Sequence, residues 1–290
     1  MIVVRIKGGL GNQLFQYAAA YALSKRTKQK MKLDNSFFAH QSLRGYKLDK
    51  LNTVYKDTNP ILPLCVKITK NRYVNKLLRK IKISLPLKKP LYLLENKSDI
   101  MDEFFLIGCE DVYLDGYYQS ERYFKEYRDE LCRQFTTAYS PEQEYVDALN
   151  TIKNCTSVAV HVRRGDFLKV QHNSNPNHYL LCANYYHNAI SYIEKAIDNP
   201  VFFWFSDDID WVKENFGEQN NYVFVTMHTK NPDIDELMLM KNCKHIIAAN
   251  STFSWWASWL NENEGALHLC PAKRYGNKEM IPDEWVRIPV

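Results

Sequence analysis

Apolar residues recur along the chain with two periods, one typical of strands and one typical of helices. In the first half, strands are expected over 2–6, 32–34 and 112–114, and helices over 12–27 and 121–135. Beyond residue 154 the alternation is regular, with strands expected over 157–162, 201–205, 222–225 and 245–249, and helices over 184–197, 211–215, 234–241 and 252–260. Strands that alternate with helices predict parallel sheets with right-handed crossovers, and therefore an α/β fold.

The pattern divides the 290 residues into two halves of the same kind. We expect an N-terminal domain over 1–150 and a C-terminal domain over 151–290, two Rossmann-like units that face a cleft. Ligands of open α/β sheets bind at the carboxyl ends of the strands. Polar residues that directly follow a predicted strand are therefore the first candidates for a functional site.

The strand expected over 157–162 runs directly into Arg163 and Arg164, with Asp166 two residues further on. Two guanidinium groups at a strand end suit a pyrophosphate, because each planar fork pairs with phosphate oxygens through parallel hydrogen bonds. His161 is expected beside them, on the opposite face of the strand from the valines. The alternative is a surface ion pair between one of the arginines and Asp166, which would have little energetic weight.

A glycine-rich loop, with Gly8, Gly9 and Gly11, follows the first strand and opens the first helix. Leu14 stands where a dinucleotide-binding fingerprint needs its third small residue, and no Gly-Lys-Ser/Thr follows, so neither NAD nor a P-loop is indicated. The backbone N–H groups of such a loop can still bind an anion at the helix N-terminus. The alternative is a tight turn that needs positive φ angles.

The last predicted strand leads into Asn250, Ser251, Thr252 and Ser254 at the start of a helix. Hydroxyl and free N–H groups at one helix N-terminus can bind a phosphate. Serine and threonine at this position also cap helices, and different hydroxyls could serve each purpose.

Ser206, Asp207 and Asp208 end the strand expected over 201–205. A carboxylate there could accept hydrogen bonds from the N1–H and exocyclic amine of guanine. The Asp-x-Asp pairs at 208–210 and 233–235 could instead hold a divalent metal. Acidic residues at helix starts are equally favoured by capping and by the helix dipole, so no metal site is expected.

The net charge of +5 favours anionic ligands without requiring a nucleic-acid partner. No apolar run approaches the ~20 residues of a membrane span. Seven cysteines without a C-x-x-C pair, and no export signal, indicate free thiols in the cytoplasm. Residues 66–90 contain nine Lys/Arg and no Asp/Glu. This stretch is either a solvated surface or a contact with anionic lipid at the inner membrane face.

Three motifs, in this order, resemble bacterial α-1,2-fucosyltransferases of glycosyltransferase family 11: Gly8-Gly-Leu-Gly-Asn-Gln-Leu-Phe-Gln16, His161-Val-Arg-Arg-Gly-Asp166 and Asn250-Ser-Thr-Phe-Ser-Trp-Trp256. Two shorter segments also match this family, Gly116-Tyr-Tyr-Gln-Ser120 and Phe205-Ser-Asp-Asp208. The resemblance implies a GT-B fold and metal-independent, inverting transfer of L-fucose from GDP-β-L-fucose to the 2-hydroxyl of a terminal galactose in an oligosaccharide. It implies no cofactor beyond this donor substrate.

The resemblance and the strand-end argument together assign roles to residues. The residues expected to bind the donor are Gly8, Gly9, Gly11, Asn12, His161, Arg163, Arg164, Ser206, Asp207, Asp208, Asn250, Ser251, Thr252 and Ser254. Gln13, Tyr117 and Gln119 are expected to contact the acceptor. Arg163 is expected to be catalytic by stabilising the leaving GDP, and Asp166 is the candidate general base. The acceptor is expected to be a galactose-terminated glycan, lipid-linked if the enzyme works at the inner membrane face.

Two alternatives remain open from the sequence. Another GDP-sugar-dependent fucosyltransferase, of the α-1,6 or O-linked type, would share the His-x-Arg-Arg signature. A nucleotide-binding protein without transferase activity would bind the same ligand but release no GDP.

Overall fold

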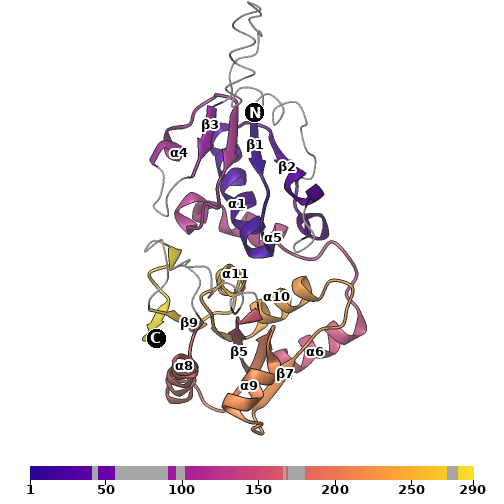
Figure 1. Ribbon diagram of the computed structural model, residues 1–290, viewed down its shortest axis with the longest axis vertical. Helices are drawn as coiled ribbons and strands as arrows, with labels where there is room; N and C mark the ends of the chain where they lie inside the picture. The colour runs from indigo at the N-terminus through magenta and orange to yellow at the C-terminus, as the bar shows by residue number, and fades with distance from the viewer. Residues whose placement is uncertain (41–44, 56–90, 96–101, 166–167, 169–179, 273–279) are drawn as a thin grey trace, which may run out of the picture. The chain divides into compact units, whose positions relative to one another are not determined.

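The computed structural model describes residues 1–40, 45–55, 91–95, 102–165, 168, 180–272 and 280–290. The chain divides into two units, Met1–Ala138 and Tyr139–Val290. Each unit has its own parallel β-sheet with helices packed on it (Figure 1). The α/β prediction is therefore confirmed for both halves of the chain.

The first unit is built on a four-stranded sheet of order β2–β1–β4–β3, in which all neighbouring strands are parallel. Its strands are β1 (Ile2–Arg5), β2 (Met31–Asp34), β3 (Leu91–Leu94) and β4 (Val112–Asp115). Its α-helices are α1 (Leu10–Thr27), α4 (Asp102–Leu106) and α5 (Arg128–Gln134). Single 3₁₀ turns lie at η1 (Ser36–His40), η2 (Leu48–Lys50), η3 (Glu121–Tyr123) and η4 (Lys125–Tyr127).

Helix α1 is the core element of the first unit and packs on β1 and β2. Four of its alanines, Ala18, Ala19, Ala20 and Ala22, are buried, so their short side chains allow neighbouring elements to approach the helix closely. The strand–glycine loop–helix–strand order places the residues after β1 and β4 at one edge of the sheet. That edge carries a polar network around Asp115, described below.

The second unit contains a six-stranded sheet of order β10–β9–β8–β5–β6–β7, again parallel throughout. Its strands are β5 (Thr156–Val162), β6 (Pro200–Ser206), β7 (Tyr222–Val225), β8 (His245–Ile247), β9 (His268–Pro271) and β10 (Val286–Ile288). Its helices are α6 (Gln143–Lys153), α8 (Ala183–Ala196), α9 (Ile209–Phe216), α10 (Pro232–Asn242) and α11 (Thr252–Trp259). The unit includes α6, which packs against β5 and α10, so the division lies nearer the N-terminus than residue 150.

Strand β5 is central and is buried on both faces. Val158, Val160 and Val162 point into one core layer together with Tyr185 of α8. His161 points to the other face, where its ring lies 5.5 Å from that of Phe253 in α11. Burial on both faces is the usual state of a central strand in a parallel sheet and accounts for its continuous apolar character.

The prediction of one helix over 121–135 is only partly correct. The segment instead forms η3, η4 and then α5, which begins at Arg128. Phe124 interrupts the helix with φ −148° and ψ 0°, and its side chain is fully buried, as is that of its neighbour Tyr123. Core packing of two adjacent aromatic rings overrides the local helical preference here. Helices α4 and α6 and strands β3, β9 and β10 have no counterpart in the sequence-based expectations.

Candidate functional site

The carboxyl ends of β5 and β6 lie side by side and bring two charged pairs together. Val162 and Ser206 are register partners, so the arginines that follow β5 face the aspartates that follow β6. Arg163 Nη1 lies 2.5 Å from Asp207 Oδ2. Because parallel strand ends meet at one edge, the expected functional edge of the second sheet is assembled as the sequence suggests.

Arg164 is held from three sides. Its Nε donates to Asp208 Oδ2 at 2.9 Å, its backbone N–H donates to Asp207 Oδ1 at 2.9 Å, and its guanidinium carbon lies 4.1 Å from the centre of the Trp211 ring. A guanidinium has five N–H donors, and these contacts occupy only one of them. The aspartates therefore orient the guanidinium group, and among the described residues they leave donors available for an anion.

The alternative interpretation of the sequence paired one of the arginines with Asp166. That residue lies outside the described residues. The observed carboxylate partners are Asp207 and Asp208. Asp208 also caps α9, since its Oδ1 accepts from the Trp211 N–H at 3.2 Å, and Ser206 Oγ accepts from the Asp208 N–H at 2.9 Å. Both Asp208 oxygens are thus engaged within the protein, which favours a supporting role for Asp208 over the expected guanine contact.

Gly165 brings the backbone close to this carboxylate. A Cβ atom at Gly165 would lie 2.6 Å from Asp207 Oδ2, closer than real Cβ contacts come. The glycine is therefore needed for close approach and not for an unusual backbone angle. This requirement explains the Arg-Arg-Gly sequence at the strand end.

His161 is a neutral imidazole inside the site. Burial, together with the nearby Arg163 guanidinium, lowers the pKa of His161 to about 3. Its Nδ1 is buried and has no hydrogen-bond partner within the part of the chain that the structure describes. Leaving a buried ring nitrogen unpaired is unfavourable, so this atom marks a place where an external polar group would be accepted.

The start of α11 supplies the third strand-end segment, after β8. Ser251 caps the helix, with its Oγ accepting from the Phe253 N–H at 3.2 Å. Ser254 is fully buried, and its Oγ accepts from the Ala249 N–H at 3.1 Å. Both of these hydroxyls are used within the protein. The remaining expected donor contacts in this segment, Asn250 and Thr252, stay predictions.

In each Asp-x-Asp pair one aspartate has a structural role, Asp208 as the cap of α9 and Asp235 through buried hydrogen bonds. Asp235 is buried, and its oxygens accept from the hydroxyls of Tyr139 (2.6 Å) and Thr229. Among the described residues, the structure contains no group of three or more His, Cys, Asp or Glu side chains that could hold a metal ion.

The Gln13 side chain stabilises the glycine-rich loop of the first unit through hydrogen bonds. Gly8 has φ +82°, and Gly9 precedes α1 in an extended conformation. The Gln13 amide nitrogen donates to the carbonyl oxygens of Gly8 (3.0 Å) and Gly45 (2.9 Å), and its oxygen accepts from the Lys47 N–H (3.0 Å). Gln13 is fully buried, so these bonds favour a role in supporting the loop over the expected acceptor contact.

The 116–119 turn lies next to this loop. Gln119 Nε2 donates to Asn12 Oδ1 at 2.8 Å, which links the two segments. Tyr117 is 40% exposed and Gly11 is buried in the first turn of α1. The structure thus brings together several residues expected at the site, and the ligand contacts of Gly8, Gly9, Gly11, Asn12, Tyr117 and Gln119 stay predictions.

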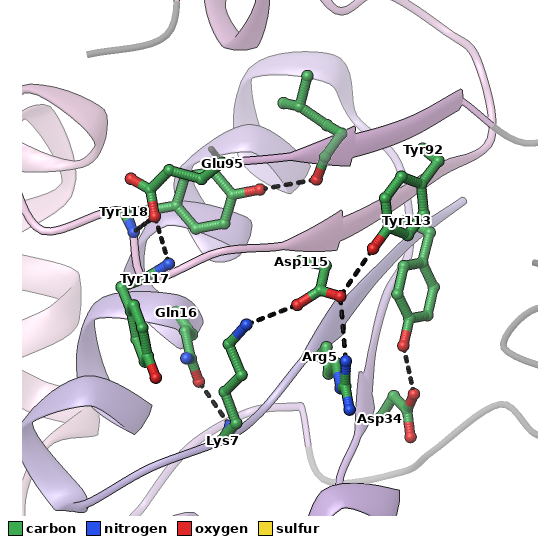
Figure 2. A network of polar contacts seen from close by, with 11 residues as sticks. Arg5, Lys7, Gln16, Asp34, Tyr92, Glu95, Tyr113, Asp115, Tyr117 and Tyr118 are labelled. Carbon is green, nitrogen blue, oxygen red and sulfur yellow. Dashed lines mark hydrogen bonds and ion pairs between the residues drawn. The ribbon is translucent and has the colours of Figure 1, made fainter. Parts of the chain in front are cut away.

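A polar network at the carboxyl-end edge of the first sheet is absent from the sequence-based expectations (Figure 2). Asp115, at the end of β4, accepts from Arg5 Nη1 (3.1 Å), Lys7 Nζ (2.7 Å) and the Tyr92 hydroxyl (2.7 Å). Burial alone would raise the pKa of this carboxyl, but the Lys7 and Tyr92 hydrogen bonds outweigh it and the pKa lies below its ordinary value. The sequence did contain one signal for this network, because Asp115 is a charged residue directly after the strand expected over 112–114.

Glu236, in the first turns of α10, was also not among the site residues expected from the sequence. Burial, with further contributions from Asp233, Asp207 and Asp235, raises the pKa of Glu236 to about 7. Its Oε1 accepts from the Met227 N–H at 3.4 Å. No local signal marks this residue, because its environment includes Asp207 and the Met227 N–H, which lie outside its helix.

Glu236→Gln should stabilise the protein in alkaline solution only. The folded-state pKa lies above the unfolded value, so the stability that protonated Glu236 contributes is present below pH ~4.5 and is lost as the pH rises through about 7. Glutamine keeps an oxygen for the Met227 N–H and never ionises. Urea unfolding should therefore give the variant a higher free energy of unfolding than the wild type at pH 8 and no advantage at pH 4; an advantage equal at both pH values would contradict this assignment.

The candidate base Asp166 and the basic stretch 66–90 both lie outside the described residues. No helix within the described ranges is long and apolar enough to cross a membrane.

Comparison with solved structures identifies the fold. A mutant of Arabidopsis thaliana FUT1 in complex with GDP is similar with a TM-score of 0.51 and 12% identity, covering 99% of this chain and 73% of that one. POFUT1 in complex with GDP-fucose is similar with a TM-score of 0.52 and 13% identity, covering 92% and 97% of the two chains. These likenesses identify the fold as GT-B type, as expected.

Comparison with characterised sequences gives closer relatives. An α-1,2-colitosyltransferase from Escherichia coli is 34% identical over 99% of both chains. The O-antigen biosynthesis glycosyltransferase WbnK from Escherichia coli is 31% identical over 98% of this chain and 99% of its own. A galactoside α-(1,2)-fucosyltransferase 2 from Sus scrofa is 25% identical over 91% of this chain and 71% of its own. Residues 1–287 match the sequence pattern of glycosyl transferase family 11, and the chain belongs to that family of glycosyltransferases.

Proposed function

We propose that this glycosyltransferase moves L-fucose from GDP-β-L-fucose to the 2-hydroxyl of a terminal galactose, with inversion at the fucose anomeric carbon. Membership of glycosyl transferase family 11 supports a sugar-transfer reaction. Two of the relatives, one 34% and one 25% identical, carry an α-1,2 linkage in their names, and the second acts on galactosides by name. The shared linkage supports attack by a 2-hydroxyl.

The observation that carries the proposal is the arginine pair at the carboxyl end of β5. Arg163 and Arg164 are fixed by Asp207 and Asp208, and contacts with the described residues occupy only one of the five N–H donors of the Arg164 guanidinium. Guanidinium groups in such a position suit the diphosphate of a nucleotide sugar. The neutral His161 beside them adds a polar ring nitrogen without adding charge.

The chemical role of these groups follows from charge development. As the bond between the sugar and the diphosphate breaks, the sugar gains oxocarbenium character and negative charge accumulates on GDP. Fixed donors directed at that charge stabilise the transition state more than the ground state. The acceptor hydroxyl must lose its proton as it attacks the opposite face of the anomeric carbon. Asp166 stays our proposed base for this step.

We propose that no metal ion takes part. Asp207 and Asp208, the acidic pair nearest the arginines, are already engaged by them. The guanidinium groups supply the positive charge that a metal would otherwise bring to a diphosphate.

Colitose is a second candidate for the transferred sugar, because a relative with 34% identity is named as a colitosyltransferase. Among acceptors, a lipid-linked glycan at the inner membrane face stays part of the proposal, supported by the likeness to a glycosyltransferase of O-antigen biosynthesis. An acceptor panel that includes α-1,6 and O-linked substrates would separate the proposed reaction from those of other fucosyltransferases.

GDP-fucose should raise the melting temperature, and the rise should survive EDTA. A ligand present at 100 times its dissociation constant adds about 2.7 kcal/mol to the folded state, enough to see as a shift in melting temperature. The measurement compares GDP-fucose, GDP-colitose, GDP-mannose, UDP-galactose and NAD, each with EDTA and with added Mn²⁺, and then tests fucose transfer to a β-galactoside.

Each outcome of this experiment is informative. Greater stabilisation and turnover with GDP-colitose would replace fucose by colitose as the donor sugar. Stabilisation that needs Mn²⁺ would contradict the metal-independent mechanism. Binding of GDP-fucose without release of GDP in the presence of any acceptor would point to a nucleotide-binding protein.

A further inference from the structure

The carboxyl-end edge of the first sheet carries polar side chains that the donor chemistry does not use (Figure 2). Lys7, just after β1, donates from Nζ to Asp115 at 2.7 Å, and its Nζ lies 5.0 Å from the centre of the Tyr117 ring. The backbone N–H of Lys7 donates to Gln16 Oε1 at 2.9 Å. The Lys7, Asp115 and Tyr117 side chains thus meet in one place, and the Gln16 side chain of α1 contacts the Lys7 backbone beside them.

Tyr117 is held rigidly although its ring is exposed. Glu95 Oε2 accepts from the backbone N–H groups of both Tyr117 and Tyr118, the latter at 2.9 Å. Gly116 has no room for a side chain, because a Cβ there would lie 2.4 Å from Glu95 Cβ. Tyr118 adopts a left-handed φ of +51°, which is unfavourable for a bulky residue and persists only where surrounding contacts impose it. These contacts fix the backbone of the turn from which the Tyr117 ring projects.

The side-chain amide of Gln16 makes only part of its possible hydrogen bonds at this edge of the sheet. The residue is fully buried, and its Nε2 has no hydrogen-bond partner among the described residues. A buried amide donor without an acceptor is costly, at about 1–3 kcal/mol. An oxygen atom from a bound molecule would remove that cost.

The charges at this edge select the chemistry of the bound molecule. Arg5 and Lys7 both pair with Asp115, and two further carboxyl groups lie near these cations, Asp34 near Arg5 and Glu95 near Lys7. An anion would meet these carboxylates. A neutral molecule with many hydroxyl groups could accept from the remaining Lys7 and Gln16 donors. Its C–H faces could pack on the Tyr117 ring, as apolar groups do on aromatic side chains.

We propose that Lys7, Gln16, Tyr117 and Asp115 form the subsite for the terminal sugar of the acceptor, an inference that rests on the proposed glycosyltransferase function. Tyr117 contacts the sugar ring, and Lys7 and Gln16 donate to its hydroxyl oxygens. Asp115 and Glu95 are positioning residues, since the first orients Lys7 and the second fixes the turn that carries Tyr117.

Tyr117→Ala and Lys7→Met test the subsite, with Tyr192→Ala in α8 as the matched control. Tyr192 is 41% exposed, close to the 40% of Tyr117, and lies in the other unit. We expect both subsite variants to raise the KM for a β-galactoside at least ~10-fold, the effect of losing ~1.4 kcal/mol of binding. Tyr192→Ala should leave this KM unchanged. Melting temperatures report whether each variant is folded.

Direct binding of methyl β-galactoside, followed by saturation-transfer NMR in the presence of GDP, separates the subsite from the proposed reaction. Loss of binding in Tyr117→Ala supports the subsite even if no GDP-sugar tested is turned over, in which case only the proposed reaction is wrong. Equal binding by wild type and both subsite variants, or no binding of any galactoside, glucoside or N-acetylgalactosaminide by the wild type, overturns the subsite.

Discussion

Replacing Arg163 by alanine should lower the rate of sugar transfer by about 10²–10³-fold, the usual loss when one fixed donor to a developing negative charge is removed. Arg163 follows β5 directly, and its ion pair with Asp207 at 2.5 Å fixes the guanidinium at the strand end. A water molecule can replace its hydrogen bonds but cannot match a charge held in place. The loss should appear in kcat as well as in kcat/KM, because the interaction strengthens as the diphosphate departs.

The fold should survive this substitution. The Arg163 side chain is 22% exposed, and a partly exposed ion pair contributes about 1 kcal/mol or less to stability. Arg287→Ala is the matched control, since Arg287 also lies in the second unit and pairs with Asp283 at 3.6 Å, at the far strand β10. The rate is measured as GDP release with saturating acceptor. Turnover of Arg163→Ala equal to that of Arg287→Ala would remove the catalytic role of Arg163.

Replacing Asp115 by alanine should lower the free energy of unfolding by about 2 kcal/mol at pH 7. Removing one partner of a fully buried ion pair costs about 3–5 kcal/mol, and the partial exposure of Arg5 and Lys7 reduces that figure. Only 7% of the Asp115 side chain is exposed, so its loss leaves two cations and the Tyr92 hydroxyl around an empty volume. Urea unfolding followed by circular dichroism measures the difference.

The effect of Asp115→Ala should depend on pH with a defined sign. The folded-state pKa of Asp115 lies below the unfolded value, so its stabilisation is complete above pH ~4 and is lost as the pH falls through the folded value. The difference between variant and wild type should therefore shrink in acid. Asp49→Asn is the control, because Asp49 is 44% exposed and pairs with its exposed neighbour Lys50. A loss for Asp115→Ala no larger than that of the control would show that the network carries no stability.

Features that depend on neighbouring residues could be predicted from the sequence. The strands at 2–5, 156–162 and 222–225 were expected within one residue, because side-chain alternation and turn residues act locally. The positions of Arg163 and Asp207 at strand ends followed from the same pattern. The segment 121–135 was predicted incorrectly because burial of Phe124 depends on the rest of the core.

By itself, the sequence determined that the chain forms two α/β halves and that polar groups follow particular strands. Only the tertiary structure decided which of these groups meet. Asp207 is the carboxylate that holds Arg163, because the order of the second sheet places β6 beside β5. Asp115 joins Lys7 because β4 lies beside β1, although the two residues are 108 positions apart. Strand order depends on the burial of whole elements, so no local pattern encodes these long-range pairs.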